Sequence, residues 1–273
     1  MKSIRELKIF DASSSRLHEM VAEALAGDPV DAGFEVDYQP IVRLEDANIV
    51  AVEALARWRH PVAGRIDPGI FVACAERLGL MGILDDFVLN HVCADAGLLR
   101  EVYGQEVDLH VNISASRLGR LDLEAAILWA LDRHGLRPGR LTLEITETSR
   151  IVDLDAAAAA IGRIRAGGVR VALDDFGSGF NTLRQLHALS IDVVKLDAAL
   201  TSASLEPWRT EALCRSVLTI CKDMGVIVVA EGIETVRQVL VLQHLGCQLG
   251  QGYLYGIPQP LERPQPQRQV AGS

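Results

Sequence analysis

Two adjacent carboxylates, Asp174 and Asp175, follow a short apolar run and precede a Gly-Ser-Gly turn. Residues 169–173 are predicted to form a buried strand that ends at this pair. Neighbouring carboxylates repel each other unless cations or hydrogen-bond donors neutralise them, and Mg²⁺ and similar hard ions prefer oxygen ligands. A solvated turn in which the glycines supply the positive φ angles would account for the same residues. This segment alone leaves both interpretations open.

Polar side chains also stand at the ends of the other predicted strands. They are Glu53, Asn112, Glu144 with Glu147 just beyond it, Lys195 with Asp197, Glu231, and Gln251, which opens the last predicted strand. In α/β barrels the carboxyl ends of the strands form one rim, and this rim carries the active site. Taken singly, Glu53 could lie on the surface, Asn112 could satisfy a turn, and Lys195 could pair only with Asp197. Their succession on one strand after another favours a shared site.

The residue types at this rim suit metal-assisted chemistry at phosphorus. Asp174 is predicted to bridge two cations, with Glu53, Asn112 and Glu144 around the first cation and Asp175 near the second. Two ions about 3.5–4 Å apart can clamp the attacking and leaving oxygens of an in-line displacement. Lys195 is predicted to hold or polarise the attacking water.

The order of predicted elements indicates the fold that must position these residues. Strands are predicted at residues 34–42, 49–54, 107–113, 141–146, 169–173, 192–196, 226–230 and 250–254. Helices are predicted at residues 68–99, 123–134, 153–166, 181–189, 206–224 and 234–245. The connection between the first two strands is too short for a crossover helix, so this pair is predicted to be antiparallel. The later alternation favours a parallel sheet, and eight strands favour closure.

We therefore predict an α/β fold, a TIM-like (β/α)8 barrel with an antiparallel first strand. An open doubly wound sheet is the competing architecture, and its Rossmann form lacks the expected Gly-x-Gly-x-x-Gly after the first strand. Residues 1–30 are predicted to hold an amphipathic helix over residues 15–26, which would suit a connector from an upstream sensor or cyclase module. Residues 31–260 form the predicted barrel domain, and the Pro- and Gln-rich residues 261–273 form a predicted disordered tail.

Composition excludes several classes of protein. The 273 residues carry 27 Lys and Arg against 36 Asp and Glu, a net charge of −9, which argues against nonspecific binding to nucleic acid or anionic membranes. No uninterrupted apolar stretch of about 18 residues is present, so a cytoplasmic protein without a membrane segment is predicted. Five widely spaced cysteines favour reduced core thiols. His60, His91 and His110 lack metal-ligand spacing and are interpreted as structural or surface residues.

The sequence resembles the EAL-domain cyclic di-GMP phosphodiesterases of bacterial signalling over residues 34–260. The motifs that carry the resemblance are Tyr38-Gln-Pro-Ile41, Glu53-Ala-Leu-Ala-Arg-Trp58, Asn112-Ile-Ser114, Glu144-Ile-Thr-Glu147, Asp174-Asp-Phe-Gly-Ser-Gly179, Lys195-Leu-Asp197, Ala230-Glu-Gly-Ile-Glu234 and Gln251-Gly-Tyr253. The resemblance implies Mg²⁺- or Mn²⁺-dependent hydrolysis of cyclic di-GMP to linear pGpG, with two ions, and a homodimer. It also implies the barrel with an antiparallel first strand, which the short connection had already suggested.

The resemblance implies a role for each residue of these motifs, and no metal-ligand position departs from the family pattern. It implies metal ligation by Glu53, Asn112, Glu144, Asp174 and Asp175, catalytic roles for Lys195, Glu231, Glu147 and Asp175, and substrate contacts by Gln39, Leu55, Arg57 and Gln251. Lys195 matches the lysine that contacts the catalytic water, and Glu231 matches a base or water-mediated ligand. Glu147 matches the residue that fixes the Asp-Asp-Phe-Gly loop, which is also linked to dimerisation. The sequence leaves open how Lys195, Glu231 and Asp175 divide the activation of water.

Two other functions remain as alternatives. A cyclic di-GMP receptor would bind the dinucleotide without hydrolysing it, and family members of that kind usually lack one or more metal ligands. An enolase-like barrel enzyme would use rim carboxylates for Mg²⁺ and a lysine for proton abstraction. Such an enzyme would not need the adjacent Asp174 and Asp175 or Arg57.

Overall fold

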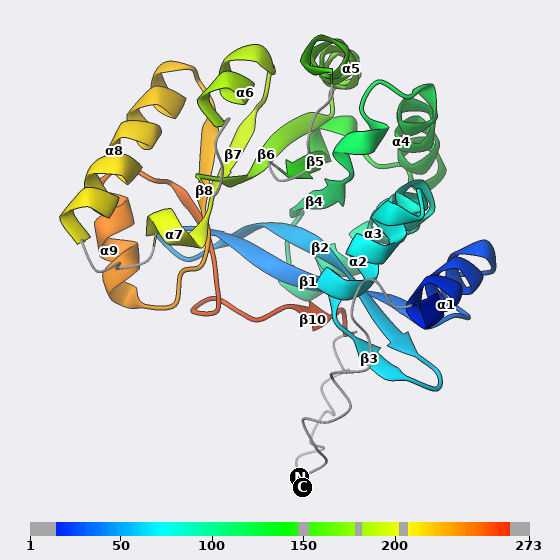
Figure 1. Cartoon of the computed structure of the whole chain (residues 1–273). Helices are drawn as coiled ribbons and strands as arrows, with labels where there is room; N and C mark the ends of the chain where they lie inside the picture. Colours follow the sequence, from blue (N-terminus) through cyan, green and yellow to red (C-terminus); the bar gives the residue numbers. More distant parts are fainter. Residues whose placement is uncertain (1–14, 147–152, 178–181, 202–206, 263–273) are drawn as a thin grey trace, which may run out of the picture.

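A closed barrel forms the centre of the protein (Figure 1). The computed structural model describes residues 15–146, 153–177, 182–201 and 207–262. Strand β1 (Phe34–Arg43) runs antiparallel to β2 (Ile49–His60), and the following strands run parallel to β2. These are β4 (Asp108–Ile113), β5 (Leu141–Thr146), β6 (Arg170–Phe176), β7 (Val193–Leu196), β8 (Ile227–Ala230) and β9 (Leu249–Gln251). Strand β9 pairs with β1 and closes the barrel, which confirms the predicted fold and its antiparallel first strand.

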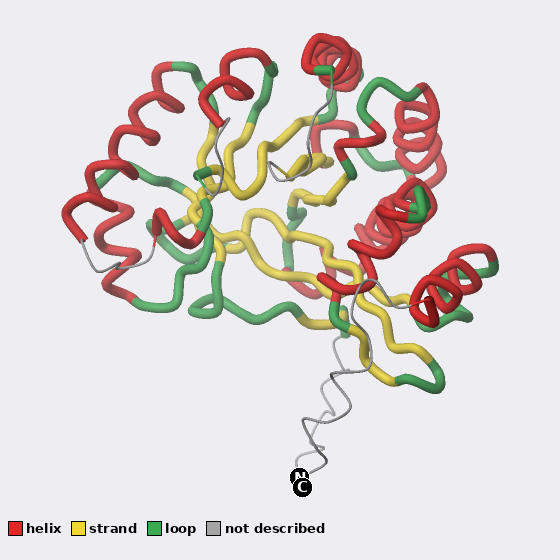
Figure 2. The backbone as a smooth tube through the Cα atoms, viewed as in Figure 1, coloured by secondary structure: helices red, strands yellow, loops and turns green. Residues whose placement is uncertain are grey.

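Helices surround the strands on the outside of the barrel (Figure 2). They are α1 (Ser15–Ala26), α2 (Pro68–Arg77), α3 (Met81–Tyr103), α4 (Leu121–His134), α5 (Leu154–Ala166), α6 (Thr182–Ala188), α7 (Ala198–Thr201), α8 (Pro207–Asp223) and α9 (Val236–His244). Two short antiparallel strands extend the sheet: β3 (Gly64–Ile66) pairs with β2, and β10 (Gln259–Pro260) pairs with β1. Within the described residues, no helix is long and apolar enough to span a bilayer.

Several predicted boundaries were wrong. Strand β2 continues to His60 instead of ending at residue 54, because its second half pairs with the start of β1 and with β3. Strand β6 continues through Asp174 and Asp175 to Phe176. Strand β9 ends at Gln251, although Gln251 was predicted to open the last strand. The single helix predicted over residues 68–99 is two helices, because Gly79 at φ +70° turns the chain between α2 and α3.

A second apolar cluster lies where α1 packs against the β1–β2 end of the barrel. Trp58 is fully buried there, stacks on Phe34 with ring centroids 4.9 Å apart, and donates Nε1–H to the Ala32 carbonyl at 3.0 Å. Leu17 and Val21 of α1 are equally buried in this cluster. Helix α1 has the bounds predicted from its spacing, whereas the domain boundaries proposed at residues 30 and 260 stay predictions.

Replacing Trp58 should test how much this cluster contributes to stability. We expect Trp58→Ala to lower the free energy of unfolding by about 3–5 kcal/mol, because it removes a large buried ring and leaves a cavity. The exposed Trp208 is the matched control, since Trp208→Ala should change stability by about 0.5 kcal/mol or less. Urea unfolding followed by circular dichroism measures both. Equal effects of the two substitutions would contradict the packing assigned to Trp58.

Candidate active site

The ammonium of Lys195 lies among four carboxylates inside the barrel, near its carboxyl-terminal rim. Lys195 Nζ is 3.0 Å from Glu53 Oε2, 2.8 Å from Glu144 Oε2 and 2.9 Å from Glu231 Oε1. It is 3.2 Å from Asp174 Oδ1. The side chain is 1% exposed, so these contacts are made almost without water. The alternative in which Lys195 pairs only with Asp197 is wrong: Lys195 contacts the four carboxylates, and Asp197 accepts from the Ala199 amide at the start of α7.

Strand alternation brings these side chains to one level of the barrel. Side chains two residues apart on a strand point to the same side, and in a barrel one side is the interior. A layer of small apolar side chains fills the interior below the site, formed by Ile41, Ala51, Ala172, Val193 and Val229. Two residues nearer the rim, the same strands carry Gln39, Glu53, Asp174, Lys195 and Glu231. Strand β1 runs in the opposite direction, so its rim residue precedes its apolar one in sequence.

Both carboxylate oxygens of Glu53 accept hydrogen bonds from amide side chains. Asn112 Nδ2 donates to Oε1 at 2.8 Å, and Gln251 Nε2 donates to Oε2 at 2.6 Å. Gln251 Nε2 also donates to Gln39 Oε1 at 3.0 Å. Burial would raise the pKa of Glu53, but Lys195 and these donors outweigh it and lower the pKa to about 2. Glu53 is therefore held as an anion although it lies in the middle of β2.

Glu144 is completely buried, and its second partner was not predicted from sequence. His110 Nδ1 lies 2.6 Å from Glu144 Oε1. Burial, followed by the charge of Lys195, lowers the pKa of His110 to about 3, so its ring is neutral. Burial raises the pKa of Glu144 well above its usual value. The available signal was alternation, since His110 precedes Asn112 by two residues and therefore shares its face of β4.

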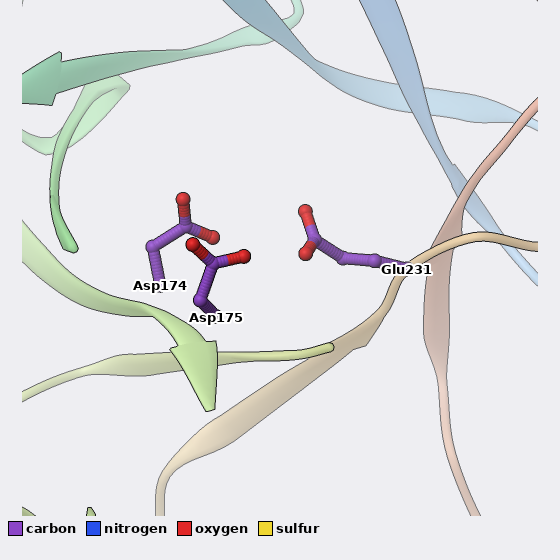
Figure 3. A group of neighbouring side chains, drawn as sticks. All are labelled: Asp174, Asp175 and Glu231. Atoms are coloured by element: carbon purple, nitrogen blue, oxygen red, sulfur yellow. The ribbon is translucent and has the colours of Figure 1, made fainter. Parts of the chain in front are cut away.

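Three carboxylates form the group best placed to hold a cation. Asp174, Asp175 and Glu231 each offer an oxygen within 4.8 Å of the others, and Figure 3 shows the two aspartates of β6 facing the glutamate that follows β8. Consecutive strand residues normally point to opposite sides, but Asp175 adopts φ +55° at an irregularity of the β6–β7 pairing. This left-handed conformation is rare for a non-glycine residue and directs both aspartates to the same opening.

The net charge of this site and the oxygen atoms that it offers as ligands fit divalent cations. Lys195 contributes one positive charge, and Glu53, Glu144, Asp174, Asp175 and Glu231 contribute five negative charges when ionised, so the sum is 1 − 5 = −4. Two dications would balance this sum. Oδ1 of Asp174 is buried, and its partner among the described residues is the ammonium of Lys195 at 3.2 Å, a contact that lacks hydrogen-bond geometry. Carboxylate and amide oxygens are the ligands that Mg²⁺ and Mn²⁺ prefer.

An open cavity of about 400 Å³ leads to these carboxylates. Gln39, Glu53, Leu55, Asp175, Glu231 and Gln251 line it, together with residues of the loops after β7, β8 and β9. Three of the predicted substrate contacts, Gln39, Leu55 and Gln251, therefore line this cavity. Arg57 lines a second cavity, which shares Leu55 with the first, and its Nε donates to Asp37 Oδ2 at 2.7 Å. Glu147 lies outside the described residues.

A model of the EAL domain family matches residues 19–258. The chain belongs to this family. The EAL domain is 34% identical to the cyclic di-GMP phosphodiesterase NbdA of Pseudomonas aeruginosa, over 94% of this chain and 32% of the relative. It is 34% identical to MucR of the same organism, a bifunctional diguanylate cyclase/cyclic di-GMP phosphodiesterase, over 83% of this chain and 33% of the relative. The chain thus spans about a third of these curated relatives.

A solved structure agrees with the barrel of this EAL domain. The PaMucR phosphodiesterase in its c-di-GMP complex superposes with a TM-score of 0.79 at 32% identity. The superposition covers 88% of this chain and 97% of that chain.

Metal affinity should increase with pH. Burial, and next the charge of Asp174, raises the pKa of Asp175 to about 6, and burial raises the pKa of Glu231 to about 7. Protons on these oxygens compete with cations, so Mn²⁺ affinity should rise between about pH 5.5 and about pH 7.5 and then level off. Calorimetry in buffers of different ionisation enthalpy measures the affinity and the protons released. An affinity that is independent of pH would contradict these pKa values.

The raised pKa values of Asp175 and Glu231 also predict how the stability of the metal-free protein depends on pH. Their pKa values are higher in the folded than in the unfolded chain, so folding binds protons and stability falls as pH rises through the raised values. Saturating Mn²⁺ should remove this loss. In Asp175→Asn the loss should shrink, since one titrating carboxyl is gone and asparagine tolerates the left-handed conformation. Thermal unfolding at pH 5.5, 6.5 and 7.5 compares the two proteins.

Proposed function

We propose that this EAL domain is a metal-dependent phosphodiesterase that hydrolyses cyclic di-GMP to linear pGpG. The observation that carries the proposal is the group of carboxylates at the carboxyl-terminal rim of the barrel, four of which surround Lys195, with Asp175 beside Asp174 and Glu231. The similarity to NbdA and to the PaMucR phosphodiesterase in its c-di-GMP complex supports the choice of substrate.

Two sets of oxygen ligands are proposed for Mg²⁺ or Mn²⁺. The first consists of Glu53, Asn112, Glu144 and Asp174, and the second of Asp174 and Asp175, with Glu231 within reach of both aspartates. The chemistry that such ions supply when bound is activation of water and neutralisation of charge on the phosphate oxygens. Asn112 would exchange its hydrogen bond to Glu53 for a contact through its carbonyl oxygen.

Different residues of the chain would then have different roles in hydrolysis. Water attacks phosphorus, the bond to the 3′ oxygen breaks, and the phosphate stays on the 5′ side of the opened dinucleotide. Lys195 would orient the attacking water, because its ammonium lies at the centre of the carboxylates. Glu231 would accept the proton, since its pKa of about 7 suits a general base near neutral pH and its side chain borders the cavity.

Substrate recognition is proposed for the residues around the cavity. Cyclic di-GMP carries two negative phosphodiesters, and Arg57, held by Asp37, is a cation that lines the second cavity together with Leu55. Gln39 and Gln251 form a hydrogen-bonded amide pair next to Glu53, and Leu55 offers an apolar side chain on the same face of β2. A carboxylate-rich site repels such an anion until cations are present, which makes substrate binding depend on the metal.

The wider context of the domain is part of the proposal. A homodimer, a cytoplasmic location, and a sensor or cyclase module upstream of α1 are proposed for the protein. The relatives support an additional module, because this chain spans about a third of their length and one of them is described as bifunctional.

Chromatography of cyclic di-GMP incubated with the protein tests the proposed activity. We expect linear pGpG with Mg²⁺ or Mn²⁺ and none with EDTA. Glu53→Gln and Glu53→Ala should each lower turnover by at least about 100-fold, because each removes a proposed metal ligand. Glu35→Gln, which changes an exposed glutamate of the adjacent strand β1, should leave turnover unchanged.

Circular dichroism of the two Glu53 variants should match that of the unsubstituted protein. Loss of folding would contradict the assignment of Glu53 as a rim ligand. If calorimetry showed binding of cyclic di-GMP but no metal supported turnover, the protein would be a cyclic di-GMP receptor and the proposed enzyme activity would be wrong. A different product from a different substrate would favour the enolase-like alternative.

A further inference from the structure

We propose that His110 is the positioning residue for Glu144: its Nδ1–H holds the carboxylate in the orientation in which Glu144 binds a metal ion. This inference rests on the proposed function. It assigns a purpose to a buried histidine that the sequence pattern had left as a structural or surface residue.

Lys195 donates to one oxygen of Glu144, Oε2, at 2.8 Å. An ammonium has three N–H groups, whereas Lys195 Nζ lies within 3.2 Å of four carboxylates, so it cannot bond to all of them at once. Glu53 has two further donors in Asn112 and Gln251. For Glu144, the further hydrogen-bond partner among the described residues is His110, whose Nδ1 lies 2.6 Å from Oε1.

The surroundings of His110 fix the position of its ring. Its strand neighbours Leu109 and Val111 are fully buried on the outer face of β4. His110 itself pairs in register with Glu53 of β2 and Thr142 of β5, and it is 5% exposed. A ring held from both sides in a close-packed interior has little freedom to turn away from Glu144.

His110 and Lys195 contact different oxygens of Glu144. His110 Nδ1 lies 2.6 Å from Oε1, and Lys195 Nζ lies 2.8 Å from Oε2. When Glu144 is ionised, as a metal ligand must be, the proton of this hydrogen bond sits on Nδ1. The bond thus fixes Oε1. It leaves Oε2, the oxygen now paired with Lys195, for the metal.

Manganese affinity in the absence of substrate tests this role directly. Ligand carboxylates depend on their hydrogen-bond partners, so His110→Leu should weaken Mn²⁺ binding by about 10–100-fold. His110→Asn should restore most of the affinity, because the asparagine Nδ2 occupies the position of the imidazole Nδ1. Electron paramagnetic resonance counts free Mn²⁺ in each titration. The control is His134→Leu, which changes a histidine of α4 that is bonded to Asn90 and should leave affinity unchanged.

The outcomes separate the role of His110 from the proposed function. If the Leu and Asn variants lose affinity equally, His110 matters only for packing and the inference fails. If His110→Leu binds Mn²⁺ as tightly as the unsubstituted protein, the inference also fails while the metal site stands. If the unsubstituted protein binds no Mn²⁺, the proposed function is wrong, and the inference about His110 is wrong with it.

A measurement on the unsubstituted protein covers the case in which the Leu variant does not fold. Nuclear magnetic resonance of the ¹⁵N-histidine-labelled protein with Mg²⁺ distinguishes the two neutral tautomers of His110. We expect the proton on Nδ1 and a slowly exchanging resonance for it. A proton on Nε2 would overturn the inference, because Nδ1 could then donate nothing to Glu144.

Discussion

The ammonium of Lys195 lies close to carboxylates from β2, β5 and β6 and from the residue after β8, and burial strengthens each contact relative to water. Because carboxylates from four parts of the barrel contact this one ammonium, the position of each carboxylate depends on the others. The apolar layer below gives the group a dry support, and the cavity above opens it to solvent. A charged group in this setting is costly to bury without a ligand, and the same cost favours the binding of cations.

Much of this arrangement could be predicted from the sequence, because barrel closure depends on simple patterns. The short connection between Arg43 and Ile49 required an antiparallel pair, and the later alternation of strands and helices required a parallel sheet. Most rim residues were identified as polar residues near the ends of apolar runs. Glu53 was identified for the wrong reason: it lies in the middle of a long strand and points into the barrel by alternation, as Gln39 does on β1.

Other features depend on three-dimensional context that one sequence does not contain. His110 has no metal-ligand spacing, and its partner Glu144 is 34 residues away on the neighbouring strand. The φ of +55° at Asp175 breaks the usual alternation and is stabilised by tertiary structure, since local preference would give the second aspartate an outward direction. Glu231, which faces Asp174 and Asp175, likewise comes from a strand far along the chain, so the segment around the two aspartates does not reveal it.

The reversed direction of β1 determines the side from which the chain enters the barrel after α1. In a fully parallel barrel every strand enters from the side opposite to the site. Here the strand that follows α1 enters from the side of the site itself, and the first half of that strand carries Asp37 and Gln39. Strand β10 returns to pair with the same half at Asp37 and Tyr38. Strand β1 pairs Glu35 with Arg57 and Gln39 with Glu53, so the strand that follows α1 is joined directly by backbone pairing to the strand that carries Glu53 and Arg57.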